Sequence, residues 1–156
     1  MTDTRFIVSK NRFPVTIDMR DGNRLTGHFF LHFAKDETGV PETPIDLING
    51  ETRFIVFDGE EKGICFVGKD SILRILYTED TSSTLDDSVE NFSTSILVAM
   101  SDGQQISGDV AALLPEEHTR LFDLLNRDEY KFLAVQVNAK EKMLVNMDYI
   151  NSVTTQ

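Results

Sequence analysis

The chain has 156 residues, 40% of them hydrophobic and nine of them glycine, so it can bury the core of one ordinary domain or two very small ones, and wholesale disorder is excluded. Its 15 basic and 26 acidic residues give a net charge of -11, which opposes general binding to a nucleic-acid backbone. A single cysteine, Cys65, excludes an internal disulfide, and neither a membrane span nor a leader peptide is visible, so we expect a soluble, cytoplasmic protein without membrane contact.

Three blocks of sequence recur in the same order, which indicates a tandem duplication. In the first block, IDMRDGNRLTG aligns without gaps on VAMSDGQQISG, and the turn dipeptide Asp-Gly is shared. In the second block, DLINGETRFIVF matches DLLNRDEYKFLAV with one added residue. The three matched pairs of segments are 17–27 with 98–108, 46–57 with 123–135, and 66–75 with 144–153.

The duplication predicts a first repeat at 1–78, a linker at 79–93 and a second repeat at 94–156. The linker, EDTSSTLDDSVENFS, carries five acidic and no basic residues, whereas the first repeat has 12 acidic and 10 basic ones. Its few apolar residues follow no period that could bury a face, which is typical of a solvated connector. The alternative is an acidic docking peptide.

Each repeat has the pattern of five short β-strands. In the first, Val15, Ile17 and Met19 alternate with polar residues before Asp-Gly, which predicts a hairpin with a type I′ turn. The segments RFIVF, GICFV and ILRILY supply three more strands, and the second repeat offers SILVAM, QISGDVA, KFLAVQV, KMLVNM and INSV. Five strands in so short a repeat favour a strongly bent sheet or small barrel. The predicted fold class is therefore mainly β, with two tandem five-stranded bent-sheet or barrel modules, which resemble Sm-like or SH3-like barrels.

A short helix is predicted in the second repeat only. PEEHTRLFDLLN, residues 115–126, begins with proline and two glutamates, which suit a helix N-terminus, and places leucines on one face. The equivalent VPETPIDLIN has two prolines and predicts a turn at most. The shared Asp and Asn of these passages predict turn chemistry, or alternatively ligand contacts. They are Asp46, Asn49, Asp123 and Asn126.

Few residues suggest catalysis or metal binding. His28 and His32 would lie about 13 Å apart on a strand, too far to share one metal ion. Neighbouring side chains diverge around His118, and Cys65 between apolar residues predicts a buried small side chain. Phosphate-loop, dinucleotide, nucleophile-elbow and zinc motifs are absent from the sequence. We therefore expect no enzyme activity, no catalytic residues, no metal and no cofactor.

The repeated order of a strand, Asp-Gly, a strand with a following glycine and an Asp/Asn-bearing connection resembles the Sm-like family of small barrels. The copies also resemble a small bacterial β domain of unknown function. The Sm-like resemblance implies binding of RNA through the central connection and an Arg-Gly or Lys-Gly pair. That pair is Val67-Gly68 in one repeat and Val145-Asn146 in the other. Because the cation is missing from both, nucleic-acid binding is not expected.

Two functions follow as hypotheses. The first is a non-catalytic protein-interaction or adaptor module, in which sheet edges and an apolar strip around Phe30 meet a protein partner or form a homo-oligomer. The second is an Sm-like ligand-binding module, in which the Asp46/Asn49 and Asp123/Asn126 connections hold a nucleotide or short RNA.

Overall fold

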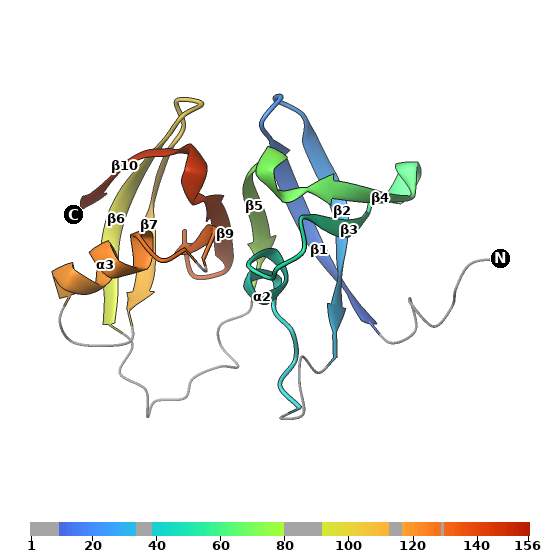
Figure 1. The fold of residues 1–156 in the computed structure, drawn as a ribbon, viewed down its shortest axis with the longest axis horizontal. Coiled ribbons are helices and arrows are strands. Elements are labelled where there is room, and N and C mark those ends of the chain that lie inside the picture. The colour runs from blue at the N-terminus through green and yellow to red at the C-terminus, as the bar shows by residue number, and fades with distance from the viewer. Residues whose placement is uncertain (1–9, 34–38, 80–91, 113–116, 129) are drawn as a thin grey trace. The chain divides into compact units, whose positions relative to one another are not determined.

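The computed structural model describes residues 10–33, 39–79, 92–112, 117–128 and 130–156. The chain divides into two compact units, residues 1–75 and 76–156, and is mainly β with short helices (Figure 1). Within the described part of the chain, no helix has the length and apolar character needed to cross a membrane.

The first unit is a sheet with the strand order β5-β1-β2-β3-β4. The pairs β1–β2, β2–β3 and β3–β4 are antiparallel. Two 3-10 turns, η1 and η2, precede the last two strands, and β5 crosses the boundary of the unit. The elements are β1 (Lys10–Met19), β2 (Arg24–His32), α2 (Pro44–Ile48), β3 (Phe54–Asp58), η1 (Glu60–Lys62), β4 (Ile64–Gly68), η2 (Lys69–Ser71) and β5 (Ile72–Thr78).

The hairpin of β1 and β2 forms where it is predicted, but its turn is of another kind. A type I′ turn needs positive φ at both central residues, whereas only Gly22 has it, at 93°. Residues 20–23 connect the strands, and the Gly22 N–H donates to the carbonyl of Met19 at 3.0 Å. The side chain of Asp21 accepts from the Asn23 N–H at 2.9 Å. This bond stabilises a longer turn, so the prediction of type I′ is wrong.

Gly27 allows β2 and β3 to approach closely. A Cβ at this position would collide with the carbonyl oxygen of Asp58 and come within 2.8 Å of Phe57 Cζ, so only glycine fits here. Phe29 and Phe57 are 0% and 1% exposed, and their rings meet edge to face with centroids 6.2 Å apart. This geometry is favourable for aromatic pairs. The core of the first unit is therefore built on the crossing of β2 and β3.

The first unit contains a five-residue helix, α2, where the sequence predicts only a turn. Thr43 is its N-cap, and Thr43 and Asp46 form a reciprocal capping box. Pro44 occupies the first turn, where its missing N–H has no intrahelical partner in any case. Pro44 therefore starts the helix instead of preventing it, and the prediction that only the second repeat has a helix is wrong.

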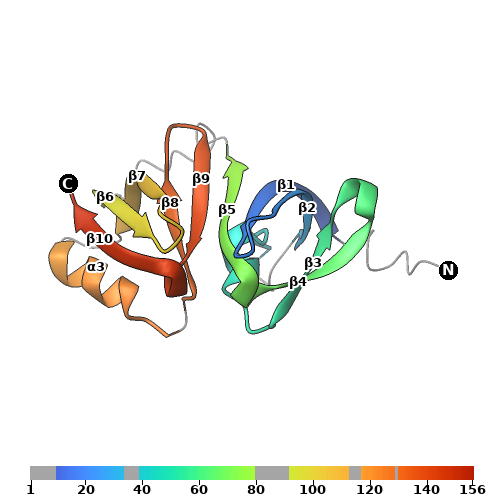
Figure 2. The same cartoon turned by 90° about the horizontal axis from the view of Figure 1, so that it is seen from above.

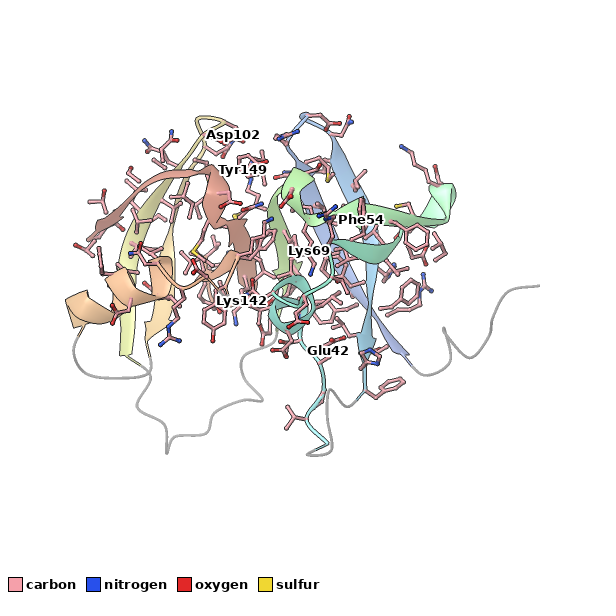
Figure 3. The ribbon with its side chains drawn as sticks, in the orientation of Figure 1. Glu42, Phe54, Lys69, Asp102, Lys142 and Tyr149 are labelled. Atoms are coloured by element: carbon pink, nitrogen blue, oxygen red, sulfur yellow. The ribbon has the colours of Figure 1, made fainter. Side chains whose placement is uncertain are left out.

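The second unit is a sheet with the strand order β10-β6-β7-β8-β9. The strand pairs β10–β6, β6–β7, β7–β8 and β8–β9 are antiparallel. In Figure 3, Asp102 marks the tip of the β6–β7 hairpin, and Tyr149 lies in the 3-10 turn η4. The elements are β6 (Phe92–Met100), β7 (Gln105–Ala112), α3 (Glu117–Leu125), β8 (Phe132–Gln136), β9 (Glu141–Asn146), η4 (Met147–Tyr149) and β10 (Ile150–Thr155).

The helix predicted at 115–126 is present as α3. Its Leu121, Leu124 and Leu125 are half-buried, whereas Phe122 is exposed. The backbone of β6 begins at Phe92, two residues before the predicted start of the second repeat. Most of the predicted linker lies outside the described residues.

Candidate interaction surface

The β3–β4 hairpin forms one edge of the first unit. β4 is the last strand in the order of this sheet, and among the described residues its only strand partner is β3. Figure 2 shows the two strands as a hairpin joined by η1. A strand at an edge leaves a row of backbone N–H and C=O groups unpaired, and such a row is a template for a further strand. β4 is therefore the natural starting point for an interaction surface.

The outer face of this hairpin is apolar. Phe54, Ile64 and Phe66 are 55%, 52% and 71% exposed, and we call them the apolar strip. The register pairs Phe54 with Gly68 and Val56 with Phe66, so the strip residues share one face of the sheet. Figure 3 labels Phe54 on this hairpin. Three large exposed apolar side chains on one edge are a feature of interaction sites.

The inner face of the same hairpin is part of the core. Ile55, Phe57 and Val67 are 2%, 1% and 5% exposed. They alternate with the residues of the apolar strip along each strand, as the two-residue period of a strand requires. The buried residues hold the hairpin in place, and the strip adds nothing to the core of its own unit.

Two shallow depressions lie along the hairpin, with volumes of about 370 and 270 Å³. Leu25 and Cys65 line both of them. Phe54 and Phe66 of the apolar strip line the larger one, whereas Glu60 and Glu61 line the smaller. Arg24 and Lys62 also line the smaller one, so the surface beside β4 is hollowed, with an aromatic part and a part that carries charges of both signs.

The two ends of the hairpin carry charges of both signs. Arg53, immediately before β3, and Asp70, after β4, are exposed at one end, and Glu60, Glu61 and Lys62 of η1 are exposed at the other. Lys69 follows β4 but is only 4% exposed, and its Nζ donates to the carbonyl of Gly50 at 2.9 Å. The turn at η1 therefore has more exposed acidic than basic residues, whereas Arg53 and Asp70 balance at the other end.

The predicted site residues of the first unit belong to α2. Asp46 Oδ2 accepts from the Thr43 N–H at 3.1 Å and from Thr43 Oγ1 at 2.8 Å. Asn49 is the C-cap, and its backbone N–H donates to the carbonyl of Ile45, while the Gly50 N–H donates to that of Leu47. With φ of -89°, Asn49 is not left-handed. The structure thus places Asp46 inside one short helix and Asn49 at its C-terminal end.

The predicted site residues of the second unit belong to α3. Asp123 lies in its last turn and is exposed. Asn126 follows the helix, and its side-chain Nδ2 donates to the carbonyl of Phe122 at 2.8 Å. The same carbonyl accepts from the backbone N–H of Asn126 at 3.2 Å, so the side chain adds a second hydrogen bond at the helix end. The side-chain contact of Asn126 is therefore a contact with its own helix.

Two other candidates occupy positions that differ from expectation. Phe30 is only 4% exposed, so the prediction of an apolar strip around Phe30 is wrong, and the strip lies on β3 and β4. Cys65 is half-buried, whereas the sequence predicts a buried side chain. The sequence signal for the strip is the unbroken apolar run in RFIVF and GICFV. Because neighbouring residues of a strand point to opposite faces, such a run makes both faces of the hairpin apolar.

The two histidines of β2 have different contacts. His28 Nδ1 lies 3.5 Å from Arg12 Nη2 and 3.9 Å from Glu60 Oε1, and the backbone N–H of His32 donates to Glu42 Oε1 at 3.0 Å. No group of three or more potential metal ligands occurs among the described residues. The side chain of His118 lies outside the described part of the chain.

Comparison with known proteins yields no match to a family model, to a curated protein or to a solved structure.

Proposed function

We propose that the chain is a non-catalytic protein-interaction or adaptor module, built from two duplicated small β domains of Sm-like type. A partner docks at the β3–β4 hairpin of the first unit by adding a strand to β4 and covering the apolar strip. In this mode backbone hydrogen bonds supply affinity, and the alternating side chains supply specificity. We place the module in the cytoplasm, a location that the free thiol of Cys65 suits.

The observation that carries this proposal is the exposure of Phe66, 71%, at the centre of an edge strand. A side chain of this size exposes a large apolar area that water does not solvate favourably. Phe54 and Ile64 extend the same apolar face. A partner that covers the three side chains gains hydrophobic free energy and satisfies the outer edge of β4 at the same time.

Equivalent hydrogen bonds in the two units support the duplication. The Arg20 N–H donates to the carbonyl of Ser71, and the Ser101 N–H donates to that of Tyr149, at 2.7 and 2.8 Å. Both bonds join the first hairpin of a unit to the 3-10 turn before its last strand. The strand order of the second unit also repeats that of the first with each label raised by five.

Close packing at corresponding glycines supports the duplication further. A Cβ on Gly108 would come within 2.6 Å of Val135 Cγ1, as one on Gly27 would crowd Phe57. In both units the second strand therefore needs a glycine where it crosses the strand after the helix.

The alternative, a nucleotide or short-RNA site at Asp46/Asn49 and Asp123/Asn126, stays a prediction. The side chain of Asp46 bonds to the N-cap residue Thr43 of its own helix, and that of Asn126 bonds to the last turn of its own helix. We therefore give the apolar strip precedence over these connections.

The test compares two variants that each place a charge on an exposed phenylalanine. Phe66→Lys changes the apolar strip, and Phe122→Lys, on the equally exposed α3 residue, is the matched control. Photo-crosslinking in a cell lysate would identify candidate partners, and each is then purified and titrated against the three proteins. The proposal expects a purified partner to bind wild type and Phe122→Lys alike and Phe66→Lys at least tenfold more weakly. A set of purified partners that bind all three proteins equally would overturn it.

A further inference from the structure

We propose that the partner of β4 is a second copy of this chain, with two β4 strands paired antiparallel about a two-fold axis at Phe66. This inference rests on the proposed function and names its partner. Each copy then supplies the same edge and the same apolar strip, as a two-fold interface requires. The two sheets of the first units become continuous across the axis.

The register follows from the sequence of β4, Ile64–Gly68. An axis at Phe66 sets Phe66 opposite Phe66 of the second copy and Ile64 opposite Gly68 of the second copy. The position of a Cβ on Gly68 lies 3.3 Å from Cε1 of Phe54, so the Phe54 ring covers this glycine. Ile64 therefore meets the Phe54 ring of the second copy, and every member of the apolar strip gains an apolar neighbour.

The two-fold axis also separates the like charges of the two hairpins. It sets the turn of one hairpin, with Glu60, Glu61 and Lys62, beside the end of the other hairpin that holds Arg53 and Asp70. Parallel pairing of the same strands would instead set each of these charges beside its own counterpart, which is unfavourable. The charges thus favour the antiparallel arrangement over the parallel one.

The strand β10, at an edge of the sheet of the second unit, is a poorer partner for β4. Its Asn151, Ser152, Thr154 and Thr155 are exposed and polar. A second copy that offered β10 would place polar side chains beside Phe66 and leave apolar area uncovered. Self-pairing of β4 covers apolar groups with apolar groups.

The area of the apolar strip sets the expected affinity. An aromatic side chain buries about 150–250 Å², so three half-exposed side chains offer roughly 300–400 Å² per copy. Two copies together remain below the roughly 1,200 Å² of a stable interface. We therefore expect a reversible dimer with a dissociation constant in the range of about 10–100 µM.

Sedimentation equilibrium from about 5 to 500 µM tests the pairing on the full chain. The mass should rise from 17.6 kDa to twice that value and stop there. Phe66→Lys should weaken association at least tenfold, because two ammonium groups then meet at the axis, whereas Phe122→Lys should associate as wild type does. Circular dichroism establishes that both variants are folded.

Cross-linking tests the register in a Cys65→Ser background. Residues opposite one another on antiparallel strands have Cα atoms about 4.5–5.5 Å apart, which a disulfide can bridge. Phe66→Cys should therefore form a disulfide-linked dimer on mild oxidation, and Ile64→Cys, which faces Gly68 of the second copy, should form much less. Equal or greater cross-linking of Ile64→Cys would overturn the register.

A wild-type chain that stays monomeric at 500 µM, or that assembles beyond two copies, would overturn the pairing. The proposed function is tested below 1 µM, where the chain is monomeric, so the two fail separately. A monomeric chain whose purified partner is lost in Phe66→Lys overturns the pairing and supports the proposed function. A dimer abolished by Phe66→Lys supports the pairing even where no other protein responds to this substitution.

Discussion

The β3–β4 hairpin of the first unit and the β8–β9 hairpin of the second have the same register but opposite exposure. Phe54 pairs with Gly68 in one, and Phe132 pairs with Asn146 in the other. Yet Phe132 is 2% exposed where Phe54 is 55% exposed. The outer face of this hairpin is thus buried in the second unit and exposed in the first.

The central residues of the two hairpins repeat the contrast. Leu144, which takes the place of Phe66, is fully buried, whereas Phe66 is the most exposed large apolar residue of the described chain. The two units therefore use the same face differently. In the second unit this face is buried and contributes to stability, whereas in the first unit it is exposed.

The largest effect is expected where both units need a glycine. Gly27→Ala places a methyl group against the carbonyl of Asp58, and we expect it to destabilise the fold by about 3 kcal/mol or more, because backbone cannot move aside as a side chain can. Gly108→Ala should act in the same direction with a smaller effect, since its nearest carbonyl, that of Gln136, lies farther away. Urea unfolding followed by circular dichroism measures both.

Thr26→Ala, on the exposed neighbour of Gly27, serves as the control and should change stability by less than about 0.5 kcal/mol. If Gly27→Ala unfolded at the same urea concentration as wild type, the close approach of β2 and β3 would be disproved.

The second effect compares the two hairpins directly. Leu144→Ala should lower the free energy of unfolding by about 2–4 kcal/mol, because a fully buried side chain leaves a cavity. Phe66→Ala should change it by less than about 0.5 kcal/mol while weakening self-association. Urea unfolding at low concentration and sedimentation at high concentration separate the two readouts. Equal destabilisation by both substitutions would contradict the claim that this face stabilises the second unit but not the first.

How far the sequence predicts the structure is visible in these hairpins. The ten strands of the described residues lie where apolar runs or apolar alternation, bounded by turn residues, place them, because these patterns act locally. The exposure of Phe54 and Phe66 does not follow in the same way. An unbroken apolar run such as RFIVF fits a strand covered on both faces, so only the tertiary structure reveals which face is open. The helix α2 was missed because Pro44 was interpreted as a breaker and not as a first-turn residue.

The third effect comes from charges that only the first unit has. Asp18 accepts from Arg24 Nε at 2.7 Å and from Arg74 Nε at 3.0 Å, whereas the corresponding positions of the second unit hold Ala99, Gln105 and Ser152. Partial burial raises the pKa of Asp18, but the hydrogen bonds and charges of the two arginines together lower it, so that the pKa lies below its ordinary value of 3.8. Ionised Asp18 therefore stabilises the fold at neutral pH.

Asp18→Asn should lower stability by about 1–2 kcal/mol at pH 7. Because the folded-state pKa is depressed, the stabilisation is complete above the unfolded value of about 3.9 and disappears as the pH falls through the folded-state pKa. Urea unfolding at pH 7, 5 and 3 should thus show the variant and wild type converging on acidification. Asp148→Asn, whose side chain is 71% exposed beside Lys131, is the control with little effect. A difference that grew at low pH would contradict the assignment.

The smallest effect separates capping from ligand binding at the helix ends. Asn126→Ala removes the bond from Nδ2 to the carbonyl of Phe122, and we expect a loss of roughly 0.5–1 kcal/mol, measured as a lower midpoint of thermal unfolding. Asn126→Asp, which keeps the size of the side chain but removes the amide donor, should lose about as much. Were Asn126 a ligand-binding residue, Asn126→Ala would leave the midpoint unchanged and abolish binding of a labelled nucleotide or oligoribonucleotide measured by fluorescence anisotropy. The two readouts move in opposite ways, so one pair of experiments decides between a scaffold residue and a binding residue.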